Sequence, residues 1–220
     1  LSDIIGIMKT LEDILLDINA FIDLDASLPT GTELTTRVNY ANQAVWDANA
    51  ITKFQEFETI WVANPSNASI SLPTNFKDLN ASPRVMLSDA SFREYPLISP
   101  NERYDVDQDG YYSYLLGNPA SGYTLVFMNM ASDATLSLNY QRFPSGMATL
   151  TDICELSDPQ YVVSKACSYI LQGRDDARFP IVEADAQRRL ANMIGENQIK
   201  NRGSIPSTRK YGASAYSLGS

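Results

Sequence analysis

The sequence predicts an α+β protein: a four-helix bundle of two N-terminal and two C-terminal helices, with an inserted antiparallel β-sandwich or barrel and an extended C-terminal tail. Apolar residues recur at a spacing of three or four near both ends of the chain, whereas the middle holds short β-prone runs between Pro, Gly, Asn and Asp. The predicted boundaries are 1–58 for the first helices, 59–146 for the β domain, 147–200 for the last helices and 201–220 for the tail.

The N-terminal helices are predicted from one apolar face each. In the first, from Ile4 to Ile22, apolar residues keep the helical spacing. The string Leu-Pro-Thr-Gly then breaks the pattern, and Thr32 can cap a second helix that begins near Glu33. The apolar stripe of this second helix is expected to contain Leu34, Val38, Ala41, Val45, Trp46, Ile51 and Phe54.

The C-terminal helices follow the return of the helical period after the β region. Asp158 and Pro159 are expected to cap and open a helix that ends near Gly173. The last helix is expected from about Pro180 to Ile199. Because each of the four helices is apolar on one side, the two ends of the chain are expected to pack together in one bundle.

Strands are predicted from β-branched and aromatic runs that lie between turn residues. Alternation is clearest at 135–140, where Leu136, Leu138 and Tyr140 share one face. Strands are expected at 61–63, 69–72, 84–87, 95–98, 111–116, 123–128 and 136–143.

Composition disfavours several classes of function. Histidine is absent, which removes the usual general base and the commonest zinc ligand. The two cysteines, Cys154 and Cys167, indicate neither a zinc site nor a disulfide framework, and no phosphate-binding glycine loop occurs. No apolar run is long enough to cross a membrane, and no export signal is visible. The composition therefore disfavours most hydrolase mechanisms, and we expect no cofactor and no membrane partner.

Charge is distributed unevenly along the chain. Residues 1–173 hold 9 basic and 21 acidic side chains, whereas residues 174–220 hold 8 basic and 5 acidic. No acidic residue follows Glu196. The acidic body is expected to repel nucleic acid, and the C-terminal end to seek an acidic surface.

The string DVDQDG is similar to the start of a calcium-binding loop, because Asp105, Asp107 and Asp109 occupy its first three ligand positions. Such a loop closes with a Glu at its twelfth position, which here is Leu116, and helices should flank it. The pattern instead favours an Asp-Gly turn between two strands. The three aspartates are the candidate metal ligands of the sequence, although no metal is expected.

Several longer strings occur in a fixed order: TELTTRVNYANQAV at 32–45, ISLPTNF at 70–76, YYSYLLGN and YTLVF at 111–127, LNYQRFP at 138–144 and DPQYVVSKACSYIL at 158–171. They resemble, respectively, the second helix, a strand that ends in Leu-Pro, the aromatic hairpin, the strand that leaves it and the third helix of one family. This is the tail-adaptor family of tailed bacteriophages, the head-to-tail connector or tail tubular protein A-like proteins. The resemblance covers most of residues 5–195.

This resemblance implies a structural virion protein without catalytic residues, assembled in the host cytoplasm. Twelve copies would form an adaptor ring in the neck, between the portal protein and a nozzle, tail-tube or tail-completion protein. The ring would line part of the channel through which double-stranded DNA leaves, without sequence-specific binding. The tail is expected to lie on the portal or on a neighbouring subunit through Arg202, Arg209, Lys210, Tyr211, Tyr216 and Leu218.

Other functions stay open at this point. The nearest is another neck component, such as a stopper or a tail-completion protein. A calcium-dependent β-domain binding module would rest on DVDQDG and would show calcium-dependent stability. An enzyme that uses carboxylates would need two of them close together in a concave site.

Overall fold

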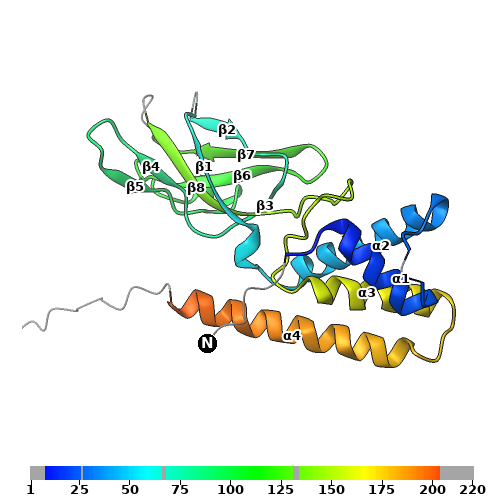
Figure 1. The fold of residues 1–220 in the computed structure, drawn as a ribbon. Helices are drawn as coiled ribbons and strands as arrows, with labels where there is room; N and C mark the ends of the chain where they lie inside the picture. The colour runs from blue at the N-terminus through cyan, green and yellow to red at the C-terminus, as the bar shows by residue number, and fades with distance from the viewer. Residues whose placement is uncertain (1–7, 26, 66–67, 131–133, 204–220) are drawn as a thin grey trace, which may run out of the picture.

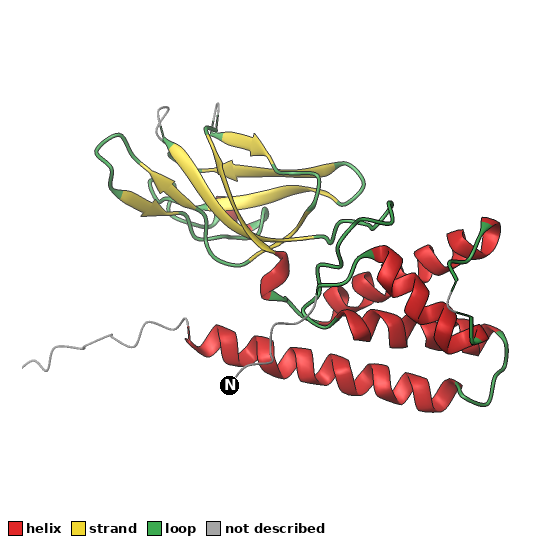
Figure 2. Cartoon of the chain, viewed as in Figure 1, coloured by secondary structure: helices red, strands yellow, loops and turns green. Residues whose placement is uncertain are grey.

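The computed structural model describes residues 8–25, 27–65, 68–130 and 134–203 of the chain. Within them the protein is α+β, with helices towards both ends of the chain and two antiparallel sheets between them (Figure 1). The helices gather on one side as a helical module, and the strands lie beside it as a β module (Figure 2). Each module has a hydrophobic core of its own.

Helix α1 (Leu11–Asp23) begins later than the predicted helix. Thr10 is its N-cap: the Thr10 hydroxyl accepts a hydrogen bond from the Asp13 N–H at 3.2 Å, and the Asp13 carboxylate accepts one from the Thr10 N–H at 3.0 Å. This reciprocal cap fixes the start of the helix, and residues 8–10 are not helical. The start predicted at Ile4 lies outside the described residues.

Helices α2 (Gly31–Ile51), α3 (Pro159–Gly173) and α4 (Phe179–Gly203) complete the helical module. The predicted start of α3 is confirmed, because Asp158 accepts a hydrogen bond from the Gln160 N–H at 3.0 Å and Pro159 occupies the first turn. Helix α3 is the most deeply buried helix, and its buried apolar residues are Tyr161, Val162, Val163, Ala166, Cys167, Ile170 and Leu171.

The prediction of a four-helix bundle is wrong. The helices occur as two pairs with the strands between them in the chain, and α3 packs against α1, α2 and α4, whereas α4 packs extensively only against α3. The reason is the narrow apolar stripe of α4, which can face one neighbour only. A groove therefore separates α1 from α4 above α3. The buried residues of the stripe are Val182, Ala186, Leu190 and Met193.

The β module consists of a five-stranded and a three-stranded antiparallel sheet. In the larger sheet β8 is central, with β1 along one side and β3 and β4 along the other, while β5 pairs with β4. In the smaller sheet the order is β2, β7, β6. The bounds are β1 (Glu58–Ala63), β2 (Ser69–Ser71), β3 (Phe76–Leu79), β4 (Arg84–Met86), β5 (Phe92–Glu94), β6 (Ser113–Asn118), β7 (Gly122–Phe127) and β8 (Thr135–Arg142).

Alternate residues of β8 face the core of the β module. Leu136, Leu138 and Tyr140 are buried there, as the alternation predicted, and belong to the same cluster as Leu125 of the smaller sheet. Trp61 of β1 lies opposite Leu138 and packs against this cluster. The two sheets therefore bury their facing sides against each other.

Two predictions for the middle of the chain are wrong. The strand expected at 95–98 lies earlier, at β5, and β3 was not among the expected strands. The Asp109-Gly110 turn does not join a hairpin, because it lies in the long connection between β5 and β6, which belong to different sheets and are separated by the 3-10 helix η2 (Glu102–Tyr104). The hairpin instead joins β6 to β7, between Gly117 and Gly122, both of which have positive φ.

Two segments connect the modules. Residues 52–57 lead from α2 to β1 through the 3-10 helix η1 (Gln55–Phe57), and residues 143–158 lead from β8 to α3. Phe54 and Phe57 of the first segment are buried in the helical core, so this connection is anchored in the helices. No helix in the described part of the chain is long and apolar enough to cross a membrane.

Candidate functional site: an aromatic pocket at the module junction

Two long polar side chains of the larger sheet reach the helical module. Lys77 of β3 donates to the carbonyl oxygen of Asn49 and, at 3.3 Å, to its Oδ1. Asn49 lies in the last turn of α2, whose carbonyl groups have no partner within the helix. Gln141 of β8 donates to the Phe54 carbonyl oxygen at 2.8 Å. These bonds hold the C-terminal end of α2 beside the sheet.

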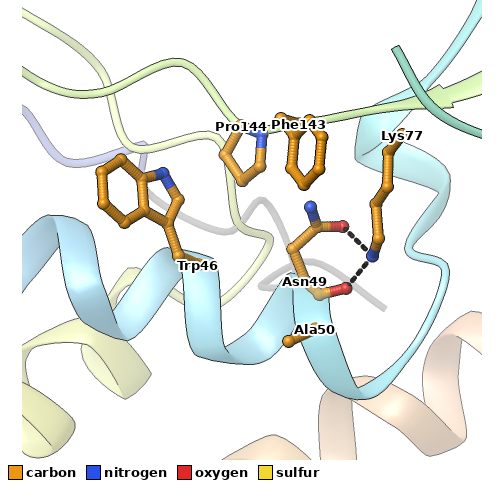
Figure 3. Close-up of a pocket in the computed structure, with 6 residues that line it drawn as sticks. All are labelled: Trp46, Asn49, Ala50, Lys77, Phe143 and Pro144. Carbon is orange, nitrogen blue, oxygen red and sulfur yellow. Dashed lines mark hydrogen bonds between the residues drawn. The ribbon is translucent and has the colours of Figure 1, made fainter. Parts of the chain in front are cut away.

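A pocket of about 400 Å³ opens at this junction (Figure 3). Its walls come from α2, from β3 and from the segment that follows β8. In Figure 3, Phe143 and Pro144 stand above α2 between Trp46 and Lys77, and Lys77 points towards Asn49. The lining residues are Trp46, Asn49, Ala50, Lys77, Phe143 and Pro144.

The position of Trp46 on α2 explains why its ring lies in the pocket. Helix α2 packs through Ala41, Ala44, Val45 and Ala48, and Trp46 lies beside this buried face, with 49% of its surface exposed. The sequence placed Trp46 on the buried stripe, which is wrong. The signal that could have located the buried face is the repetition of alanine at a spacing of three and four.

Phe143 and Pro144 form the opposite wall because β8 ends at Arg142. Proline has no N–H to donate to a strand ladder, so the chain leaves the sheet here and turns towards α3. The Phe143 N–H donates to the Asn75 carbonyl oxygen at 2.7 Å, which fixes the backbone while 45% of the residue stays exposed. The pocket therefore has two large aromatic rings on a rigid backbone.

The charged group in the lining of the pocket, the Lys77 ammonium, forms hydrogen bonds between the modules. Burial lowers the pKa of the Lys77 ammonium group, although the nearby Asp78 carboxylate raises it. The ammonium group bonds to neutral oxygens of Asn49 and faces no nucleophile in the lining. The pocket is thus suited to binding an apolar or aromatic group, and it lacks the paired acid and base of a catalytic site.

A second hollow, the α1–α4 groove, has α3 as its floor and a volume of about 780 Å³. Ala20, Phe21, Ile181 and Val182 make one end apolar. The other end is polar, and its charges pair with one another: Lys9 binds Asp17 and Gln160, and Arg189 binds Asp185 and Asp158.

The candidate metal ligands Asp105, Asp107 and Asp109 lie in one loop but do not converge. Among the residues that the structure describes, no group of three or more His, Cys, Asp or Glu side chains is placed to hold a metal ion. Asp107 Oδ1 instead accepts the Asp109 N–H at 3.1 Å. Asn129 holds the loop with two hydrogen bonds to its backbone carbonyls, at 2.7 and 2.9 Å.

The predicted tail contacts fall outside the described residues, and they stay predictions. The backbone of Arg202 lies in the last turn of α4, which extends past the predicted end at Ile199. The other predicted tail residues, all outside the described residues, are Arg209, Lys210, Tyr211, Tyr216 and Leu218.

Both cysteines are free and buried. Burial raises the pKa of the Cys154 thiol to about 11 and that of Cys167 to about 12. Because the thiolate is the reactive form, neither thiol is prepared to act as a nucleophile.

No protein-family model matches the chain, and a comparison with curated proteins finds no match. The candidate site consequently rests on the geometry of the chain itself. That geometry is a half-exposed aromatic pocket between two modules, with an open groove on one of them.

Proposed function

We propose that the protein is a structural adaptor in the neck of a tailed bacteriophage, which joins the portal protein to a nozzle, tail-tube or tail-completion protein. The observation that supports this proposal best is the aromatic pocket, because a partner that fills it contacts both modules at once. Trp46 and Phe143 offer large, rigid apolar surfaces of the kind that dominate protein interfaces. The element order and the strings quoted above suggest the family.

A ring is the proposed form of the assembly. A closed ring of identical subunits needs two different surfaces on each subunit, one for each neighbour. The pocket and the apolar end of the α1–α4 groove are two such surfaces on one chain. A ring of twelve copies would match the symmetry that the resemblance implies for the portal.

Double-stranded DNA is proposed to pass through the ring without being held. The net charge of the chain is −9, so its surface as a whole repels phosphate. Each lysine or arginine that contacted a phosphate would add salt-dependent affinity and slow the passage of DNA. The proposal assigns no catalytic step, and it places the protein in the virion.

Electron microscopy of the purified chain, mixed with the portal protein of the same virus, tests the function. An added ring with the symmetry of the portal supports the adaptor, whereas the absence of a ring favours another neck component, such as a stopper. The double variant Trp46→Ala/Phe143→Ala tests the pocket, and Tyr104→Ala, which removes an exposed aromatic ring elsewhere, is its control. Rings that form equally well with the double variant would overturn the pocket as an interface.

A further inference from the structure

A third hollow, here called the acidic pocket, has a volume of about 470 Å³, and its Glu56 pairs with Lys200 near the C-terminal end of α4. Exposed apolar side chains of Met8 and Ile153 line it. Their segments are held side by side, because Thr10 pairs with Ile153 and the Cys154 N–H donates to the Lys9 carbonyl oxygen at 3.0 Å. The lining also includes Glu56, Glu155, Leu156 and Pro159.

Glu56 in this pocket has a carboxylate oxygen that lacks a donor. Its Oε2 is buried and has no hydrogen-bond partner among the described residues. Its Oε1 faces Lys200 Nζ at 3.7 Å, which is an ion pair without a hydrogen bond. Glu155 differs, because Arg142 binds it at 2.7 Å. A buried carboxylate oxygen without a donor is unfavourable, so a cation that reached Glu56 would stabilise the protein.

Helix α4 brings the C-terminal segment to this place. Asn197 donates to the Lys53 carbonyl oxygen at 2.8 Å and accepts the Gln55 N–H at 3.0 Å, so the helix is fixed to the segment that contains Glu56. Lys200 follows one turn later, and α4 reaches Gly203, about 5 Å farther along its axis. The described part of α4 therefore ends within one turn of Lys200, the ion-pair partner of Glu56.

We propose that residues 204–220 dock in the acidic pocket of their own chain, with the Arg209-Lys210 pair binding the Glu56 carboxylate beside Lys200 and Tyr211 covering Met8. When extended, residues 204–210 span up to about 24 Å, which is ample for a pocket that begins beside the last turns of α4. This proposal replaces the expected contact of Arg209, Lys210 and Tyr211 with the portal or a neighbouring subunit, and it does not depend on the adaptor function.

Charge selects this segment over the other end of the chain. Residues 1–7 join Met8 at the same pocket, but they contain Asp3 and neither lysine nor arginine. Residues 204–220 contain two basic and no acidic side chains. A segment tethered beside its site also binds at a high effective concentration, which favours the chain's own segment over a second copy in dilute solution.

Carbodiimide cross-linking, followed by mass spectrometry, tests the contact because it joins a carboxylate to an amine that touches it. We expect a Glu56–Lys210 linkage in the full chain, with Glu56–Lys200 as an internal reference. In an equal mixture of ¹⁵N-labelled and unlabelled chains, the linked peptides should carry one isotope only. Mixed isotopes would assign the pocket to the segment of a second copy, and linkage of Glu56 to the N-terminal amine would assign it to residues 1–7; each result would overturn the proposal.

Limited digestion with trypsin provides a second measurement with a matched control. If Glu56 holds the segment, Glu56→Gln should speed cleavage after Arg209 and Lys210 by about threefold, the size expected for one partly exposed ion pair. Glu58→Gln removes a nearby carboxylate that binds Asn139 of β8 instead, and it should leave the cleavage rate unchanged. Equal rates in the wild type and both variants would contradict the docking. Neither assay contains the portal protein, so failure here is distinct from failure of the adaptor function.

Discussion

The helical module and the β module differ in how far apart in the chain their core residues lie. The helical core joins Ile18 of α1 to Leu171 of α3, across the whole β module, whereas the β core comes from one continuous stretch that begins at Leu72 and ends at Tyr140. Contacts between distant residues require a long loop to close, so the helical module depends on the complete chain. The β module closes its core within residues 58–142 and needs neither end of the chain. We therefore expect two modules that unfold separately.

The largest expected effect comes from the centre of the helical core. Leu171→Ala, at a fully buried position of α3, should lower the free energy of unfolding of the helical module by about 2–5 kcal/mol. Urea denaturation followed by circular dichroism at the helix band measures it. Ile181→Ala on exposed α4 surface is the control and should change the stability by less than about 0.5 kcal/mol. Equal loss of the β module in Leu171→Ala would show that the modules are not independent.

A similar but smaller loss of unfolding free energy is expected when a side chain is removed from the core of the β module. Leu138→Ala removes a fully buried side chain opposite Trp61, and the β module should lose about 2–4 kcal/mol. Trp61 fluorescence, recorded in a Trp46→Phe background, reports this module because its ring packs against that core. Ile60→Ala is the control, because Ile60 lies on the exposed side of β1, the strand that also carries Trp61. A helix signal that falls at the same urea concentration as the Trp61 signal would contradict separate unfolding.

Removal of a hydrogen bond between the two modules should lower the free energy of unfolding by a smaller amount. Lys77→Met keeps an apolar side chain of similar length but removes the hydrogen bonds to Asn49, at a cost of about 1 kcal/mol. The two unfolding transitions should then move farther apart. Arg84→Met, which breaks an exposed ion pair with Glu94 inside the larger sheet, is the matched control and should have almost no effect. Identical curves for both variants would count against Lys77 as a tie between the modules.

The smallest expected effect is on how far acid lowers the stability of the protein. Burial tends to raise the pKa of Asp185, but hydrogen bonds from Arg189, Arg188 and Ser164 outweigh it and lower the pKa to about 2. Because the folded pKa is below the ordinary value of 3.8, this stabilisation is present above pH 4 and is lost as the pH falls towards 2. Asp185→Asn should therefore reduce the shift in urea midpoint between pH 5 and pH 2.5. An unchanged shift would remove Asp185 from the acid response.

Local sequence patterns predicted single helices and strands well, because the residues that start a helix or alternate along a strand lie close together in the sequence. The Asp158-Pro159 start of α3 and the buried alternation of β8 are examples. The packing of the helices was not predictable in this way: the stripe on α4 shows that one face is buried, but which neighbour it meets depends on the whole chain. The pocket was missed for the same reason, since its second wall, Phe143 and Pro144, belongs to the segment after β8 and lies far from Trp46 in the sequence.

The chain enters and leaves the β module at one place, because Glu58 at the start of β1 lies opposite Gln141 near the end of β8. The two adjacent strands β1 and β8 therefore connect the β module to the helical module side by side, and both would bear a mechanical load. A pull on the far end of the β module, directed away from the helices, would divide its tension between β1 and β8 along their length. The two strands would be drawn in the same direction, so their mutual hydrogen bonds would carry little shear. Such a connection transmits force to α2 through residues 52–57 and to α3 through residues 143–158, while the sheet stays intact.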